Sequence, residues 1–324
     1  MSHDSKFSIE QSMEKLHYRS FDEWVKNFAL NLENIWIEDS ATKLMPNLDK
    51  QPFQNESAII IGRGPSVKKK NHLEILANSD FDGTIICCDG MLKNALKAGV
   101  TPTKFPKYYV VSIDPYSPAK EFYEDEIIKK YGSSINGIFS TIVKPTTVEN
   151  ARNAGIKIHW LHSLFDYNEG KKSFNQLSAL MIRSKKNSGL PAIQTGGNVG
   201  TSSWFVGWKI LKCNQICLIG INHGWEESDS WEKIISHGSD LVDTSVVDRD
   251  SPSFKKLFQT LYNPDFDCNC IVDPLFQFYS SALKEFISRS PDWLTTINST
   301  EGGSIFGKRI QGMKFQEFLN IKNS

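Results

Sequence analysis

The sequence predicts an α/β protein with a doubly wound, mostly parallel sheet of a modified Rossmann-like type. Two observations carry this prediction. Short apolar runs, typical of parallel strands buried on both faces, end at Gly or Asp, and helical patterns separate them. The 324 residues are 40% hydrophobic and 23% charged, which is ordinary for a globular protein of one large domain or two smaller ones.

An amphipathic helix comes first, with apolar side chains at steps of three and four residues and polar side chains on the other face. We expect this helix to dock on its own domain, and a partner-binding role stays open. The apolar stripe comprises Phe21, Trp24, Val25, Phe28, Leu32, Ile35 and Trp36, and the polar face comprises Asp22, Glu23, Lys26, Asn27 and Asn34. A polar segment with two prolines, 45–57, is expected to be a linker.

Strands and helices then alternate up to residue 221, and a helical C-terminal region follows. This pattern divides the chain into an N-terminal helical extension with its linker (1–55), a central α/β domain (56–312) and a C-terminal helix (313–324). The predicted strands are 58–61, 84–88, 108–113, 137–141, 156–161, 215–221 and 293–298. The predicted helices are 72–77, 91–98, 118–131, 198–211, 275–288 and 315–321.

Composition excludes several classes of protein. Lys+Arg and Asp+Glu both number 37, so no net charge favours nucleic acid or an anionic membrane. No apolar stretch approaches the roughly 18 residues of a membrane span, and the first 20 residues lack the apolar core of a secretory signal. The six cysteines form no CxxC pair and three of them lie in apolar runs, so we expect a reduced, cytoplasmic protein.

A glycine-rich loop ends the first strand of the predicted sheet. Two glycines allow the backbone to approach a ligand closely, and the start of the following helix, capped by its serine, would offer N–H groups to an anion. With the cations at 68–70 nearby, a phosphate is the expected occupant; the alternative is a plain strand-to-helix turn. Val67 stands where a dinucleotide fingerprint requires Gly or Ala, so that motif is rejected. The loop comprises Gly62, Arg63, Gly64, Pro65 and Ser66.

A second glycine-rich run leads into the helix predicted at 198–211. Asn198 and Thr201 have side chains that could hydrogen-bond a ligand at this helix start, and the alternative is a capped helix with a flexible entry. The run comprises Thr195, Gly196, Gly197, Asn198, Gly200 and Thr201.

Acids and histidines follow other predicted strands. Asp89 and Asp114 end two strands, where each would bind a ribose hydroxyl, bind magnesium, act as a general base or simply cap a helix. His223 follows the strand at 215–221, and His237 lies in a polar loop. Both are candidates for acid–base chemistry, although a lone histidine is also commonly structural.

Four motifs in order resemble the MptE-like domain family, which comprises archaeal 6-hydroxymethylpterin diphosphokinases and the Maf glycosyltransferases that modify flagellin with nonulosonic acids. They are residues 60–66, 195–204, 217–221 and 300–303, within a resemblance that spans 56–312. The first loop also resembles the Gly-x-Gly-Pro-Ser loop with which certain bacterial sialyltransferases contact a CMP-sugar.

The resemblance implies a nucleotide-binding transferase. The loop at 62–66 would hold phosphate or cytidine, Asp89 and Asp114 would line the cleft, and the run from Thr195 to Asn198 would close over the nucleotide. His237 loosely matches a histidine-containing loop of Maf-like members and would act in catalysis, with Asp114 as the second candidate. Asn222 departs from the pattern because relatives carry Asp there, so metal binding at this strand end is in doubt.

Three functions follow from these observations. The first is transfer of a sugar from a CMP-activated nonulosonic (sialic-type) donor to a small-molecule, glycan or protein acceptor, for which the sequence singles out no cofactor. The second is pyrophosphoryl transfer from ATP to 6-hydroxymethyl-7,8-dihydropterin, with Mg²⁺ held by Asp89 and Asp114. The third is a non-catalytic nucleotide-binding module. A homo-oligomer is compatible with each.

Overall fold

The computed structural model describes residues 9–46, 56–164, 173–237 and 249–322. Most of the predicted linker and the segment after His237 lie outside these ranges. Among the described helices, none is both long and apolar enough to cross a membrane.

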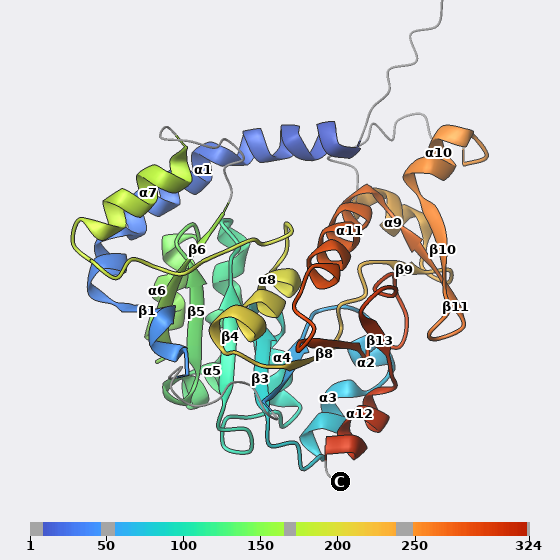
Figure 1. The fold of residues 1–324 in the computed structure, drawn as a ribbon, viewed down its shortest axis with the longest axis horizontal. Helices are drawn as coiled ribbons and strands as arrows, with labels where there is room; N and C mark the ends of the chain where they lie inside the picture. The colour runs from blue at the N-terminus through green and yellow to red at the C-terminus, as the bar shows by residue number, and fades with distance from the viewer. Residues whose placement is uncertain (1–8, 47–55, 165–172, 238–248, 323–324) are drawn as a thin grey trace, which may run out of the picture.

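A ten-stranded sheet forms the centre of the molecule, and every pair of neighbouring strands in it is parallel. Its order is β1-β6-β5-β4-β3-β2-β8-β12-β13, with β7 paired to β6. The predicted doubly wound fold is therefore confirmed (Figure 1). The strands are β1 (Asp39–Ser40), β2 (Ser57–Ile61), β3 (Thr84–Cys88), β4 (Tyr108–Ser112), β5 (Asn136–Ser140), β6 (Lys157–Ser163), β7 (Ala192–Ile193), β8 (Gln215–Ile219), β12 (Thr295–Asn298) and β13 (Ile310–Gly312).

The strand order reverses between β2 and β8. From β2 the chain builds β3 to β6 outward on one side, and it later returns to add β8, β12 and β13 on the other side. In parallel α/β sheets, ligands bind outside the carboxyl ends of the strands at such a switch point. The loops after β2 and β8 therefore mark the expected site.

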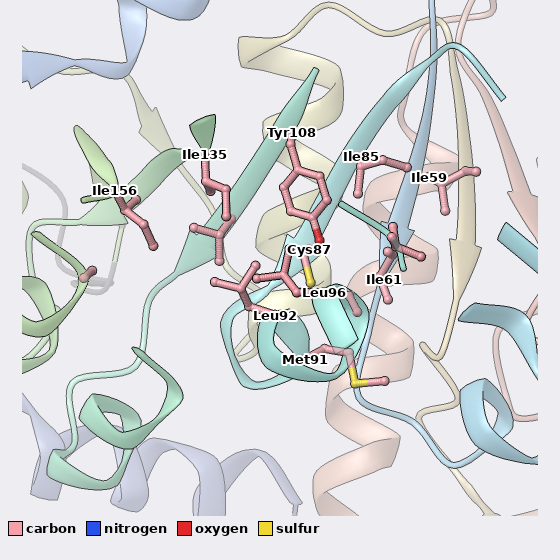
Figure 2. Close-up of a cluster of buried hydrophobic side chains, with 14 of the residues drawn as sticks. Ile59, Ile61, Ile85, Cys87, Met91, Leu92, Leu96, Tyr108, Ile135 and Ile156 are labelled. Atoms are coloured by element: carbon pink, nitrogen blue, oxygen red, sulfur yellow. The ribbon is translucent and has the colours of Figure 1, made fainter. Parts of the chain in front are cut away.

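Alternate residues of each central strand enter two different cores. Ile59 and Ile61 pack into one apolar cluster, and Ala58 and Ile60 pack into the other. Figure 2 shows the first cluster, where strand residues such as Ile85 meet helical side chains below the sheet. Because both faces are covered, the strands are continuous apolar runs, which is why the sequence predicts them well.

Helices cover both faces. The first face packs α1 (Ile9–Ile37), α3 (His72–Ala77), α4 (Leu92–Lys97), α5 (Glu126–Tyr131), α6 (Pro145–Asn153), α7 (Phe174–Arg183) and α12 (Phe315–Lys322). The second face packs α8 (Val199–Phe205), its π-helical continuation η5 (Val206–Ile210) and α11 (Pro274–Ser288). Short elements complete the chain: η1 (Ala41–Leu44), α2 (Ser66–Lys69), η2 (Asp89–Met91), η3 (Ser117–Tyr123) and η4 (Gly132–Ser134).

The single helix predicted at 118–131 is wrong, because the chain forms η3 and then α5. Asp125, between them, is extended, and its side chain accepts a hydrogen bond from the Ile127 N–H. That cap starts a new helix instead of continuing the first.

A small antiparallel unit that the sequence did not predict lies beside the main sheet. It contains β9 (Trp225–Glu226), β10 (Gln259–Asn263), β11 (Cys268–Val272), α9 (Trp231–His237) and α10 (Pro252–Leu257). Its own apolar cluster consists of Ile234, Phe254, Phe258 and Ile271. In Figure 1 this unit lies at one side of the molecule, next to α11.

Helix α1 docks on its own domain, as expected from its apolar stripe. Phe28, Leu32 and Ile35 are buried in the first core cluster. The assignment of Asn27 to the polar, outward face is wrong, because its side chain is fully buried. Its amide donates to the Pro115 and Ile142 carbonyl oxygens, 2.9 and 3.1 Å away. Hydrogen bonding of buried carbonyls, not exposure, explains this polar residue.

Asn31 extends the same interaction by one helical turn. Its amide nitrogen donates to the Thr141 and Val143 carbonyl oxygens at 3.1 and 2.7 Å, in the loop after β5. Asn27 and Asn31 thus attach α1 to loops that follow β4 and β5, at the carboxyl edge of the sheet.

Substitution Asn31→Ala removes both donors and leaves two buried carbonyls without this partner. We expect the free energy of unfolding in urea to fall by about 1–3 kcal/mol relative to Asn34→Ala. Asn34 lies one turn further along α1, so both substitutions change helix propensity alike. Equal stabilities of the two variants would contradict this role of Asn31.

Candidate functional site

The loops at the switch point touch through their backbones. The Gly62 N–H donates to the Ile219 carbonyl at 2.8 Å, and the Gly64 N–H donates to the Gly220 carbonyl at 2.7 Å. A Cβ on Gly64 would lie 2.0 Å from the side-chain oxygen of Asn222, so no larger residue fits. The two glycine N–H groups therefore bond within the protein, and these glycines serve the close approach of β2 and β8.

Ser66 and Asn222 join the same two loops through their side chains. The expectation that Ser66 caps the following helix is wrong, since the N-cap of α2 is Pro65 and makes no side-chain bond. The Ser66 hydroxyl instead donates to Asn222 Oδ1 at 2.9 Å. Asn222 is buried, and its backbone oxygen accepts from the Ser304 N–H at 2.9 Å. The side-chain oxygen and the backbone oxygen of Asn222 thus both have structural partners.

Carboxylates lie at the ends of β3 and β4. Asp89 is buried and accepts hydrogen bonds from the Ser112 hydroxyl at 2.6 Å and the Gly90 N–H at 2.7 Å. The pKa of Asp89 is raised to about 6, mainly by burial and in smaller part by the charge of Asp114, while the Ser112 and Gly90 hydrogen bonds and the charge of Arg63 oppose the rise. Burial also raises the pKa of Asp114, which accepts from the Tyr116 N–H at 2.8 Å. The charges of Asp114 and Arg63 therefore both act on the carboxyl group of Asp89.

Arg63 is the exposed member of the first loop, and its guanidinium lies 5.7 Å from the centre of the Phe122 ring. Among the three lysines that follow on α2 and its end, Lys69 pairs with Glu226 of β9. This ion pair connects the switch-point loop to the small antiparallel unit.

The second glycine-rich run forms a capped helix start. Asn198 Oδ1 accepts from the Thr201 N–H at 2.9 Å, and Thr195 Oγ1 accepts from the Gly197 N–H at 3.2 Å. These bonds are the ones expected if the run is a capped helix start with a flexible entry. The predicted ligand-binding role of Thr195, Gly196, Asn198 and Thr201 remains a prediction.

Two glycines of this run allow close packing. A Cβ on Gly197 would lie 2.6 Å from Tyr279 of α11, and one on Gly200 would lie 2.7 Å from Ile221. The run therefore connects α11 with the loop after β8.

The placement of His237 in a polar loop is wrong, because His237 is the last described residue of α9. It pairs with an acid that the sequence did not single out. Its Nδ1 lies 2.7 Å from Oδ2 of Asp273, whose side chain is fully buried at the start of α11. Its ring also contacts Phe276 and Trp225, with ring centres 4.6 and 5.2 Å away. An oriented, partly exposed histidine of this kind can exchange protons with a substrate.

Tyr279 lies within reach of both the strand-end acid Asp114 and the acid that pairs with His237, Asp273. Burial first, and then the charges of Asp273 and Asp114, raise its pKa well above the ordinary range. Its ring centre also lies 5.8 Å from that of His223. The carboxyl ends of β4 and β8 and the His237–Asp273 pair therefore face one region of the molecule.

His223 is buried and holds an unusual backbone conformation, with φ of 40°. Burial lowers its pKa to about 3, so its imidazole is neutral at physiological pH. No described residue hydrogen-bonds its buried Nδ1. This histidine is thus a neutral group at the site and not a proton exchanger near pH 7.

The partner of His237 could not be read from the sequence. Asp273 precedes Pro274 and an amphipathic helix, the usual pattern of an N-cap, and it does accept from the Phe276 N–H at 2.8 Å. From the sequence alone, this capping role is a sufficient explanation for Asp273. Its pairing with His237 requires β11 and α9 to come together, and no local sequence pattern predicts that contact.

A metal ion has no evident ligand set in the described ranges, where no three His, Cys, Asp or Glu side chains converge. A groove of about 500 Å³ lies elsewhere, between α3 and α12, at the opposite end of the molecule from α1 (Figure 1). Its lining includes Lys70, Glu74 and Gln316.

The chain belongs to the MptE-like family, because residues 26–228, well over half of its length, match the family model described as 6-hydroxymethylpterin diphosphokinase MptE-like. Among solved structures, the Maf glycosyltransferase from Magnetospirillum magneticum AMB-1 is similar, with a TM-score of 0.56 and 13% identity. The match covers 90% of this chain and 41% of that one, so this chain spans less than half of the Maf protein. At this identity the likeness shows the fold alone. A search of curated proteins gave no match.

The raised pKa of Asp89 predicts a pH dependence of stability. The folded state holds the proton more tightly than the unfolded chain, so the contribution is present below about pH 4 and is lost as pH rises through about 6. We expect unfolding free energies of the wild type, relative to Asp89→Asn, to fall by about 2 kcal/mol between pH 4 and pH 7. A constant difference between the two proteins across this range would show that Asp89 titrates normally.

Proposed function

We propose that this protein is a nucleotide-dependent transferase that moves a sugar from a CMP-activated nonulosonic (sialic-type) donor to a hydroxyl of a glycan, protein or small-molecule acceptor. The observation that carries the proposal is the His237–Asp273 pair, which lies near the switch-point loops. Membership of the MptE-like family supports a transferase of this fold.

The proposed nucleotide site is the carboxyl edge between β2 and β8. Because Gly62 and Gly64 use their N–H groups to bond β8, the nucleotide would be contacted by groups that remain available, such as the Arg63 guanidinium. The run from Thr195 to Thr201 borders this edge through Gly200 and Ile221. The sialyltransferase-like sequence of the first loop favours CMP over other nucleotides.

The proposed chemistry needs one proton exchanger and stabilisation of a leaving phosphate. His237 would take the proton of the acceptor hydroxyl, and Arg63 would balance the charge that develops on the CMP phosphate. Asp114, the second candidate base, keeps a raised pKa through burial and lies at the same edge.

Pyrophosphoryl transfer from ATP to a pterin is the second candidate, favoured by the family description. It would require Mg²⁺, which prefers several oxygen ligands in octahedral geometry. Asp89 accepts a hydrogen bond on each oxygen, Asp114 accepts one from the Tyr116 N–H, and Asn222 offers only a neutral amide. Among the described residues, no third His, Cys, Asp or Glu side chain joins the two aspartates. These donors fit magnesium poorly. Incubation with ATP, Mg²⁺ and the reduced pterin would release AMP only if this second function holds.

A nucleotide panel read by thermal or chemical unfolding tests the first function. CMP should raise the free energy of unfolding by about 2.7 kcal/mol at 100 times its Kd, because it binds the folded state alone. UDP, GDP and ATP serve as controls, each with and without Mg²⁺. The absence of any shift with cytidine nucleotides would rule out a CMP-sugar donor.

Gly197→Ala tests whether the second glycine-rich run borders the nucleotide. The added Cβ would collide with Tyr279, which should displace the run and reduce the CMP-induced stabilisation. Gly307→Ala is the matched control, since Gly307 also has positive φ but a Cβ added there would meet no atom within 4 Å. Equal CMP responses in both variants would place the nucleotide away from this run.

A further inference from the structure

Three nitrogen atoms converge on the carboxylate of Asp273, two from N–H donors and one from an imidazole ring. The indole of Trp225 and Nδ1 of His237 both lie 2.7 Å from Oδ2, and the backbone N–H of Phe276 lies 2.8 Å from Oδ1. The side chain of Asp273 is fully buried. Its charge is therefore compensated by these hydrogen bonds and not by water.

Two of the three partners can only donate. An indole N–H and a backbone N–H have no acceptor atom, so each carboxylate oxygen of Asp273 must accept from one of them. With both oxygens acting as acceptors, the bond between Asp273 and His237 requires the proton to be on Nδ1. Neutral His237 then carries its lone pair on Nε2.

Aromatic rings hold the imidazole in place. The Phe276 ring is tilted by 34° relative to the imidazole, and the Trp225 ring meets the imidazole edge-on at 78°. The His237 side chain remains 31% exposed, and Nε2 has no hydrogen-bond partner among the described residues. Within the described ranges, the nitrogen with the lone pair is thus the one without a protein partner.

We propose that Asp273 is the positioning residue of the site, which fixes His237 as the Nδ1–H tautomer so that Nε2 is the base. This role rests on the proposed glycosyl transfer. The acceptor hydroxyl gives its proton to Nε2, and its oxygen bonds to the anomeric carbon of the sugar. The bond from that carbon to the phosphate oxygen breaks, and its electron pair leaves with CMP.

The test compares Asp273→Asn with the parent in a Trp225→Phe background. Asn caps helices as well as Asp does, so its oxygen can still accept from the Phe276 N–H and α11 should stay intact. The amide nitrogen then replaces Oδ2 and donates to Nδ1, which moves the His237 proton to Nε2. Removal of the Trp225 indole avoids a clash between two donors.

Two readouts are expected to change together. Nitrogen-15 NMR of His237 near neutral pH should change from the Nδ1–H to the Nε2–H tautomer. The kcat for release of CMP from the donor sugar should fall about 10²- to 10⁴-fold, the range of general acid–base catalysis, while KM for the donor stays the same. Asp125→Asn, at another helix N-cap, is the matched control and should change neither.

The tautomer measurement needs no substrate, so it separates this proposal from the proposed function. If the wild type turns over no CMP-sugar but Asp273→Asn still moves the proton, glycosyl transfer fails and the positioning of His237 stands. The same tautomer in both proteins, or a tautomer change with unaltered kcat, would overturn the role of Asp273.

Discussion

The backbone contact between the loops after β2 and β8 is the constraint on which the rest of the site depends. A Cβ on Gly62 would lie 2.4 Å from the Gly220 oxygen, and one on Gly220 would lie 2.5 Å from the Gly62 oxygen. Neither residue can therefore carry a side chain without separating the two halves of the sheet. Two residues beyond Gly220, Asn222 accepts a hydrogen bond from the Ser66 hydroxyl, and His223 next to it has a positive φ.

Burial at this edge changes what each polar group can do. Asp89 is a weakened acid and His223 a neutral imidazole, because burial opposes the charged form of each. His237 is partly exposed and has a carboxylate partner, which makes it the group best suited to proton transfer. The proposed function thus follows from differences in burial among residues that look equivalent in the sequence.

The sequence predicted the parallel strands well because each is buried on both faces and reads as an apolar run, as at Ile59 and Ile60. It also placed the first glycine-rich loop at the end of the first central strand, which the structure locates at the switch point. It could not predict that Asn27 is buried, because the carbonyls it bonds follow distant strands. Nor could it predict the pair of His237 with Asp273, since 36 residues and a small antiparallel sheet separate them.

Hydrogen exchange with and without CMP tests most directly whether the nucleotide occupies the switch point. The account predicts that CMP slows exchange in peptides covering 62–66, 195–201 and 220–224, with no change in the groove between α3 and α12. Protection confined to that groove, or distributed evenly over the chain, would contradict the proposed site.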